Sequence, residues 1–469
     1  MATHRFPDGF LWGAATSAYQ IEGSPLADGA GMSIQHRFAH TPGNTRDGAT
    51  GDVAADHYNR WREDITIMRE LGLPAYQFSI AWPRVLPTGT GDVNKPGIDF
   101  YDRLVDGLLE AGIEPCPILH VWDLPGELQD QGGWANRDSA DWFAEYAAIA
   151  FDRLGDRAAN WLTICEPSSI VFGGYMAGVV PPAVKDIYAG LRAGHHILLA
   201  HGRAVQAFRA SDASGKIGTS STIKVAKPAS SDPADVAAAE RSTLYHTGLW
   251  LDPVMLGTYP EEITRLFGDA WPEVSDEDLA TISQPIDFVG VTYYSRDVVA
   301  AERPAVDEVA AGNGNVESFV EERRQTMGRL MGVRVIPAVG QLTGIDWPID
   351  AEGAYDALIW LRDRYGNPPI YMAESGAAFN DVVIDGKVAD PERISFIRDY
   401  LAAAHRAIAE GVDLRAWFVW SFLDTYEFWL GYSARFGLVH IDYDSLARTV
   451  KDSGFWFRDV IAANGFELP

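Results

Sequence analysis

Short apolar runs alternate along the chain with longer segments in which apolar positions recur every three or four residues. The short runs are rich in β-branched and aromatic residues, as buried strands are, whereas the longer period predicts helices. The predicted strands are 10–13, 75–82, 113–125 with its exit loop, 160–166, 216–223, 286–294, 369–374 and 414–422. The predicted helices are 53–71, 97–111, 139–154, 186–210, 234–247, 351–365, 394–410 and 452–463.

Glycine marks the ends of the first two predicted helices. Gly72 and Gly112 directly follow them, and glycine readily adopts the left-handed conformation that terminates a helix. Residues 300–345 show no clear period. We expect a long loop there, with room for a hairpin.

The order of the elements predicts the fold. Strand and helix alternate eight times, which is the pattern of a parallel sheet with crossover helices. Over 469 residues this predicts an α/β fold, a single (β/α)8 TIM barrel of residues 1–469 with long βα loops. The alternative is two doubly wound domains, but no linker or shift in composition divides the chain. No glycine-rich phosphate-binding motif follows a predicted strand, which disfavours nucleotide binding.

Two of the predicted strands end in a glutamate. Glu166 precedes Pro167, which disfavours helix at Glu166 and favours extended backbone, and Glu374 closes the apolar run 369–373. The carboxyl ends of barrel strands surround one mouth, so we expect both side chains there. A lone glutamate at a strand end is more often an ion-pair partner. Two carboxylates in matching contexts, without metal ligands, favour glycoside hydrolysis, in which one protonates the leaving oxygen and the other attacks the sugar or activates water.

Charge and cysteine content limit the partners and the compartment. The net charge of −27 argues against nucleic acid and anionic membrane surfaces as partners, because both attract Lys/Arg patches. No apolar run is long enough to cross a membrane, and the first residues lack the apolar core of a signal peptide. Cys116 and Cys165 both lie in apolar runs, as free buried thiols do in a reducing compartment. We therefore expect a cytoplasmic protein.

The chain resembles glycoside hydrolase family 1, the β-glucosidase family, from residue 6 to about residue 457. The matching segments, in family order, are FLWGAATSAYQIEG, FSIAWPRVLP, VWDLPGELQDQGGW, TICEP, LDPVMLGTYP, DFVGVTYYS, YMAESGAAF, WSFLDTYEFWLGYSARFGLVHID and KDSGFW. The resemblance implies a retaining mechanism with Glu374 as nucleophile and Glu166 as general acid/base. It implies a small-molecule glycoside as substrate and no metal or organic cofactor, and it leaves the oligomeric state open.

The resemblance also carries over part of the sugar-binding set. Gln20 matches a glutamine that holds hydroxyls of the glycone, the sugar that is released. Trp420 matches the tryptophan under the sugar, and Glu427 matches a glutamate that takes two distal hydroxyls. Tyr294 matches the tyrosine near the nucleophile, and Trp122 belongs to the VWDLP segment of the same pocket.

Five further site positions depart from the family pattern. Gln77 replaces an arginine that lies beside the nucleophile and helps to keep it ionised. Val121 replaces a histidine, and Cys165 replaces an asparagine that binds the sugar's 2-hydroxyl. Thr292 stands for another asparagine, and Phe428 for a tryptophan. These losses remove polar groups that hold glucose, so we expect a different choice of sugar.

The departures leave three interpretations. The first is an active retaining β-glycosidase with a non-standard glycone, such as a deoxy, acylated or furanosidic sugar or a disaccharide unit. The second is a glycoside-binding protein that has lost efficient hydrolysis, although both glutamates are intact. The third is a transglycosylase that uses the same intermediate. Lys224 and His120 are candidates for replacing the charge of the missing arginine, although alternation along the strand directs His120 to the face opposite Val121.

Overall fold

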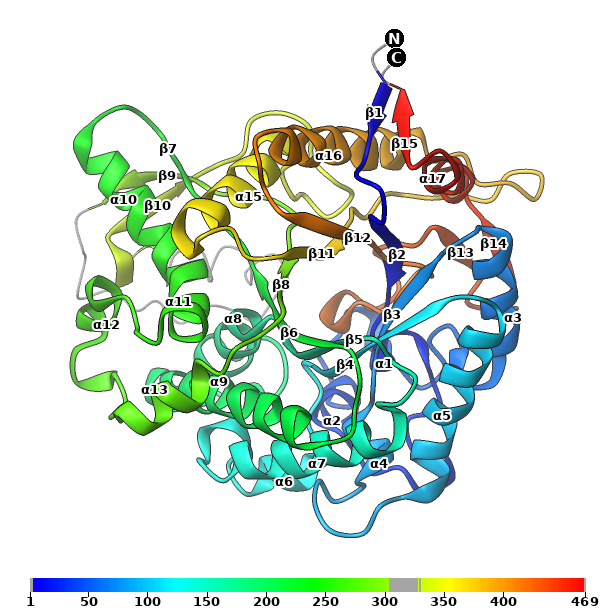
Figure 1. The fold of residues 1–469 in the computed structure, drawn as a ribbon, viewed down its shortest axis with the longest axis horizontal. Coiled ribbons are helices and arrows are strands. Elements are labelled where there is room, and N and C mark those ends of the chain that lie inside the picture. Colours follow the sequence, from blue (N-terminus) through cyan, green and yellow to red (C-terminus); the bar gives the residue numbers. More distant parts are fainter. Residues whose placement is uncertain (1–2, 303–327, 329, 468–469) are drawn as a thin grey trace.

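The computed structural model describes residues 3–302, 328 and 330–467. Its centre is a closed barrel in the order β11-β12-β2-β3-β4-β5-β6-β8, with every neighbouring pair parallel. All predicted strands are present, and the predicted (β/α)8 TIM barrel is confirmed (Figure 1). The barrel strands are β2 (Leu11–Ala15), β3 (Ala75–Ser79), β4 (Glu114–Val121), β5 (Asn160–Cys165), β6 (Lys216–Thr222), β8 (Phe288–Thr292), β11 (Ile370–Ser375) and β12 (Leu414–Trp420).

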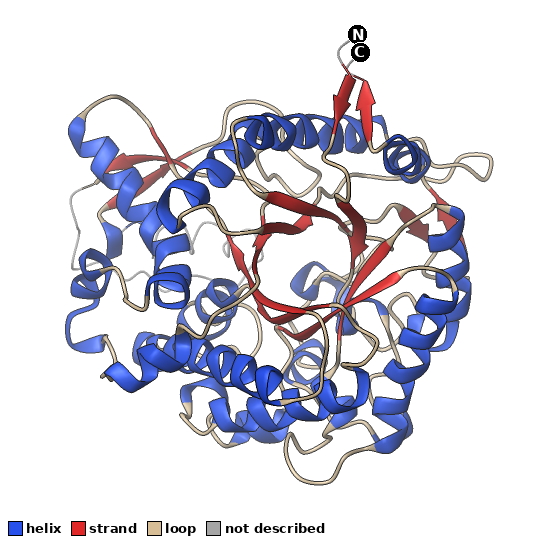
Figure 2. Ribbon diagram, in the orientation of Figure 1, coloured by secondary structure: helices blue, strands red, loops and turns tan. Residues whose placement is uncertain are grey.

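Helices surround the barrel on all sides (Figure 2). The long ones are α3 (His57–Glu70), α5 (Lys95–Glu110), α7 (Ser139–Leu154), α9 (Ile187–Ala210), α10 (Pro233–Thr243), α15 (Ala351–Tyr365), α16 (Pro391–Ala409) and α17 (Asp452–Ala463). Gly72 and Gly112 end α3 and α5 with positive φ of 63° and 75°, as predicted. The helix predicted at 234–247 is longer than expected, because α10 continues through a π-helical turn, η5 (Leu244–Gly248), into α11 (Leu249–Leu256).

Short elements fill the connections. The helical ones are α1 (Ala18–Ile21), η1 (Ala27–Gly29), α2 (Ile34–Ala39), η2 (Arg46–Gly48), α4 (Trp82–Val85), α6 (Gly126–Asp130), η3 (Gly133–Ala135), α8 (Pro167–Ser169), η4 (Ile170–Met176), α12 (Glu261–Phe267), η6 (Gly268–Ala270), α13 (Asp276–Ile282) and η7 (Phe428–Leu430). The strands outside the barrel are β1 (Thr3–Arg5), β7 (Lys227–Pro228), β9 (Val298–Ala301), β10 (Val333–Ile336), β13 (Val439–Ile441), β14 (Arg448–Val450) and β15 (Gly465–Glu467).

The predicted loop at 300–345 is partly structured. β9 and β10 pair antiparallel, which agrees with a hairpin in this region. Residues 303–327 and 329, on which the rest of that prediction falls, lie outside the described residues. None of the helices in the described part of the chain combines the length and the apolarity needed to cross a bilayer.

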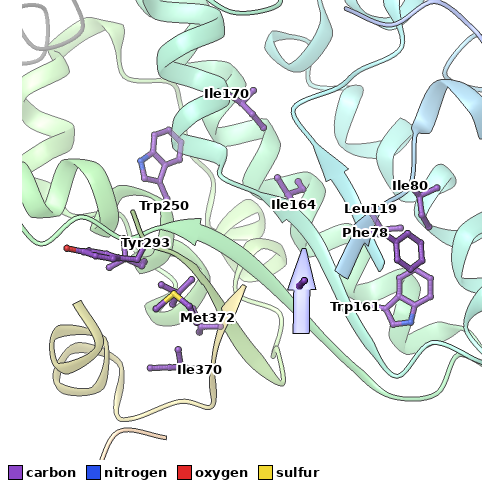
Figure 3. Close-up of a cluster of buried hydrophobic side chains, with 14 of the residues drawn as sticks. Phe78, Ile80, Leu119, Trp161, Ile164, Ile170, Trp250, Tyr293, Ile370 and Met372 are labelled. Atoms are coloured by element: carbon purple, nitrogen blue, oxygen red, sulfur yellow. The ribbon is translucent and has the colours of Figure 1, made fainter. Parts of the chain in front are cut away.

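Apolar side chains form separate cores inside and outside the barrel wall. Leu162, Cys165 and Phe288 belong to the inner cluster, whereas Trp161 and Ile164 belong to the large cluster between barrel and helices. Figure 3 shows part of that outer cluster, including Trp161 and Ile164. Strands buried on both faces are typically near-continuous apolar runs, which explains why most of the eight could be predicted. β6 departs from this pattern, because its buried sequence KIGTSST is mostly small and polar.

Both strands that end in a candidate glutamate carry a register irregularity just before it. In β5 the shift falls between Leu162 and Cys165, and in β11 it falls between Met372 and Glu374. Ala373 belongs to the inner cluster, so simple alternation would turn Glu374 outward. A β-bulge changes the direction of the following side chain. Here it directs the end of each strand toward the barrel mouth.

Candidate active site

A pocket opens at the carboxyl ends of the barrel strands. The predicted site residues that line it are Gln20, Val121, Trp122, Cys165, Glu166, Tyr294, Glu374, Trp420, Glu427 and Phe428. They come from strand ends, short helices and loops far apart in the sequence, which the barrel brings to one mouth. The predicted convergence of Glu166 and Glu374 is therefore present in the structure.

Glu374 is buried and held by two hydrogen bonds. The Tyr294 hydroxyl donates to Oε2 at 2.9 Å, and the Cys165 thiol donates to Oε1 at 3.4 Å. Burial raises the pKa of Glu374 to about 8, and the charge of Glu166 acts in the same direction. The bonds from Tyr294 and Cys165 lower the pKa but do not offset burial. Both cysteines are free and buried, as predicted.

Gln77 lies behind the nucleophile candidate rather than on the pocket wall. Its Nε2 donates to the carbonyl oxygen of Ala373 at 3.0 Å, and the side chain is buried. An amide carries no charge, so Gln77 does not oppose the rise in the pKa of Glu374. Its direct contact with substrate stays a prediction.

The two candidates for replacing the arginine charge are engaged elsewhere. Lys224 lines the pocket, but its Nζ lies 3.6 Å from Asp297. His120 packs edge-on against Trp134 and Phe143, on the face that alternation predicts. Burial lowers the pKa of His120 to about 3, so the ring is neutral and supplies no charge.

The backbone at Glu166 differs from the prediction. We expected extended geometry before Pro167, but Glu166 has φ 54° and ψ 58°, in the left-handed region. Such a conformation is unfavourable for a residue with a side chain and is found at sites where the surroundings enforce it. Here Glu166 turns the chain directly from β5 into α8, where extended backbone would carry it onward.

Two threonines hold the side chain of Glu166. The hydroxyls of Thr222 and Thr292 both donate to Oε1, each at 2.7 Å. Thr292 thus contacts a carboxylate of the site, and its predicted contact with substrate stays a prediction. Thr222 was missed by the sequence analysis, although its place at the end of β6 could have identified it.

A polar chain surrounds Glu427. Gln20 Nε2 donates to Oε1 of Glu427 at 2.9 Å, and the Thr425 hydroxyl donates to the same atom at 2.6 Å. Ser17 in turn donates to the Gln20 oxygen at 2.6 Å. Burial raises the pKa of Glu427 to about 7. Gln20 and Glu427 therefore give the pocket a polar wall.

Aromatic and aliphatic side chains cover much of the rest. Trp122 stacks on Phe428 with ring centroids 4.9 Å apart and planes at 8°. The sequence analysis missed a further set of lining residues, most of which lie outside the motifs that guided it: Ser169, Phe172, Gly173, Val180, His246, Ser295, Asp297, Val335, Trp347, Pro348 and Phe436. The pocket therefore suits a ligand with both apolar faces and hydroxyl groups.

Known proteins resemble this chain over its whole length. Beta-glucosidase A of Thermotoga maritima is 47% identical over 469 residues, covering 100% of both chains. Beta-glucosidase A of Acetivibrio thermocellus is 44% identical and covers 99% of this chain and 100% of its own. A solved structure of the Thermotoga maritima beta-glucosidase in complex with glucoimidazole is 45% identical, with a TM-score of 0.91 over 99% of this chain and 100% of that one.

The sequence model of glycosyl hydrolase family 1 matches residues 2–466. This match extends over the whole (β/α)8 barrel, and the two relatives that match over their full length are both named beta-glucosidase. The chain is therefore a glycoside hydrolase and belongs to glycosyl hydrolase family 1.

Proposed function

We propose that this chain is a retaining β-glycosidase in which Glu374 is the nucleophile and Glu166 the general acid/base. The observation that carries the proposal is that both carboxylates line one pocket and are each held by hydrogen bonds from neutral side chains. Two carboxyl groups at one cleft are the minimum that this chemistry requires.

The reaction proceeds in two displacements. A carboxylate oxygen of Glu374 attacks the anomeric carbon, the bond to the leaving oxygen breaks, and Glu166 gives that oxygen a proton. The sugar is now an ester of Glu374. Glu166 then takes a proton from water as the water oxygen attacks the anomeric carbon, and the ester bond breaks. Glu374 leaves as a carboxylate, and Glu166 is protonated again.

The hydrogen bonds to Glu166 support different roles for its two carboxyl oxygens. Thr222 and Thr292 both donate to Oε1, so that oxygen acts as an acceptor. The transferable proton therefore resides on Oε2. This arrangement fixes the direction in which the proton is delivered, which matters because proton transfer needs the donor within hydrogen-bond reach of the leaving oxygen.

The pocket wall around Val121 and Cys165 supports an altered choice of sugar. Val121 offers no hydrogen bond, and the thiol hydrogen of Cys165 is used by Glu374. A hydroxyl pointing at this wall would lose its bonds to water without finding a donor, which costs binding energy. The favoured glycone therefore has fewer or masked hydroxyls on this side, as in a deoxy or acylated sugar, a furanoside or a disaccharide unit.

Azide rescue tests the catalytic assignment. We expect Glu374→Gly to abolish turnover of a dinitrophenyl β-glucoside, and azide to restore it with an α-glycosyl azide as product. Glu166→Ala is the matched control, because azide then attacks the intact glycosyl-enzyme and gives the β-azide. Undiminished activity of Glu374→Gly would show that the nucleophile is elsewhere.

A panel of aryl glycosides and diglycosides tests the glycone. We expect a low kcat/KM on plain aryl β-glucoside compared with the deoxy, acylated, furanosidic and diglycosidic members. High efficiency on the plain glucoside would refute the altered glycone while leaving the two catalytic roles intact. Sugar transferred to an added alcohol in preference to water would identify a transglycosylase.

A further inference from the structure

Two histidines and an aspartate gather outside the active-site pocket. His36 lies on α2 and His40 caps its end, four residues apart, so both imidazoles project from the same side. Asp52 lies in the loop before α3. Its Oδ1 is 3.5 Å from Nδ1 of His36, and its Oδ2 is 3.1 Å from Nε2 of His40. Two ligand atoms of a tetrahedral zinc ion lie about 3.3 Å apart, so these separations suit a shared ion.

The hydrogen bond on the far side of His40 defines which nitrogen faces Asp52. Nδ1 of His40 is 2.8 Å from the carbonyl oxygen of His36, and a carbonyl can only accept, so Nδ1 carries the hydrogen. In the neutral ring, Nε2 then presents a lone pair to a carboxylate oxygen. A cation between these atoms removes the repulsion. Metal-binding histidines commonly donate their other N–H to a backbone carbonyl in this way.

His36 provides a second, independent indication. Its side chain is only 9% exposed. Its Nδ1, like Oδ1 of Asp52, is buried without a hydrogen-bond partner among the described residues. Buried polar atoms are normally paired, so both atoms lack a partner that a metal ion would supply.

We propose that His36, His40 and Asp52 form a binding site for a divalent transition metal, with Zn²⁺ as the ion it takes. Two imidazoles and a carboxylate are zinc ligands, and a water completes four-coordination. The side chains of His40 and Asp52 are 42% and 43% exposed, so the ion enters directly from solvent.

A bound ion would stabilise the folded chain. A bound ion links α2 to the loop that carries Asp52. α2 packs against η7, which contributes Phe428 to the active-site pocket. Metal binding to the folded chain alone stabilises it by mass action. The proposal concerns zinc binding and stability, and it is independent of the catalytic roles of Glu166 and Glu374.

Calorimetric titration of untagged protein, stripped with EDTA and dialysed, with ZnCl2 tests the site. We expect one zinc ion per chain. At zinc about 100 times above its dissociation constant, Tm should rise by roughly 3 °C for a chain of this length. His40→Gln and Asp52→Asn should abolish both signals, as should His36→Asn. His405→Gln, a histidine on α16, is the control and should keep them.

The variants at the two exposed positions, His40→Gln and Asp52→Asn, decide the outcome. Wild-type protein that neither binds zinc nor gains stability would overturn the proposal. Binding that persists in both His40→Gln and Asp52→Asn would also overturn it. Because the wild-type side chains at these two positions are well exposed, both variants should unfold in EDTA at the wild-type Tm. The decision therefore does not depend on whether the buried His36→Asn variant folds.

Discussion

The thiol of Cys165 donates a hydrogen bond to the carboxylate of Glu374, with 3.4 Å between Sγ and Oε1. The residue that precedes the proposed acid/base, Glu166, thus contacts the proposed nucleophile. Burial raises the pKa of Cys165 well above its usual range, so the group stays a thiol and remains a donor. A thiol is a weak donor. The strength of this bond therefore sets part of the pKa of Glu374.

Substitutions of Cys165 should move the pH profile in opposite directions. Cys165→Ala removes a donor to the ionised form, so the pKa of Glu374 rises and the acid limb of kcat/KM moves to higher pH. Cys165→Ser supplies a stronger donor and moves the limb to lower pH. One net hydrogen bond corresponds to roughly 0.4–1 pH unit. The measurement is the pH dependence of kcat/KM on an activated aryl glycoside, and shifts in the same direction would contradict the role of this bond.

A positive charge at position 77 should move the same limb further. The pKa of Glu374 is raised to about 8, and only the ionised carboxylate attacks, so the acid limb of wild-type kcat/KM should have its midpoint near pH 8. Gln77→Arg favours the ionised form and should lower the midpoint by roughly 1–3 units. Gln77→Met, which adds no charge, is the control and should not move it to lower pH. An unchanged profile in Gln77→Arg would show that Glu374 does not control the limb.

Removing a hydroxyl beside Glu166 should affect substrates according to their leaving group. Thr292→Val keeps the shape of the side chain but removes one of the two donors to Oε1. We expect the loss in kcat/KM to be about tenfold for a phenyl glycoside, which needs the proton. A dinitrophenyl glycoside, which leaves without it, should lose much less. Equal losses on both substrates would indicate a structural effect instead.

The buried cation Lys451 should be essential for stability. It hydrogen-bonds Asp381, and its Nζ lies 2.7 Å from Asp424 in the loop leading from β12 to Glu427. Lys451→Met removes the cation that Asp381 and Asp424 share, while Arg393 still pairs with Asp381 and Arg435 with Asp424. We therefore expect a cost of about 3 kcal/mol, at the low end for breaking a buried ion pair. Thermal and urea unfolding measure this cost. Lys95→Met, at an exposed ion pair, should change stability by about 0.5 kcal/mol or less.

Most of the barrel was predictable because its strands are buried on both faces and therefore appear as apolar runs. The exception is β6, whose sequence KIGTSST is buried but consists mostly of small polar residues, so no apolar run marks it. Helix ends at Gly72 and Gly112 followed from local chemistry as well. The end of α10 did not, because the chain continues through η5 into α11 and the packing that permits this lies outside the local sequence. Likewise, Pro167 alone suggested extended backbone at Glu166, whereas the surrounding fold enforces a left-handed turn.

Within the site, the sequence indicated which residues line the pocket better than what they contact. Cys165 was chosen because it replaces a sugar-binding asparagine, and the structure places its thiol on Glu374. Thr292 was expected at the substrate, which stays a prediction, and its hydrogen bond to Glu166 was not foreseen. Such pairings join strands that are far apart in the chain, and the distances between their side chains depend on barrel register, which no local pattern encodes.

Because of the two strand irregularities before Glu166 and Glu374, the direction of each carboxylate depends on the number of residues in its strand. The extra residue in β5 and in β11 sets which way the glutamate at the end of that strand faces. Exchanges of one apolar residue for another along these strands leave that count untouched, whereas a single-residue deletion would turn the glutamate into the helical layer. The position of each carboxylate in this chain therefore depends on the length of its strand more than on which apolar residues fill it.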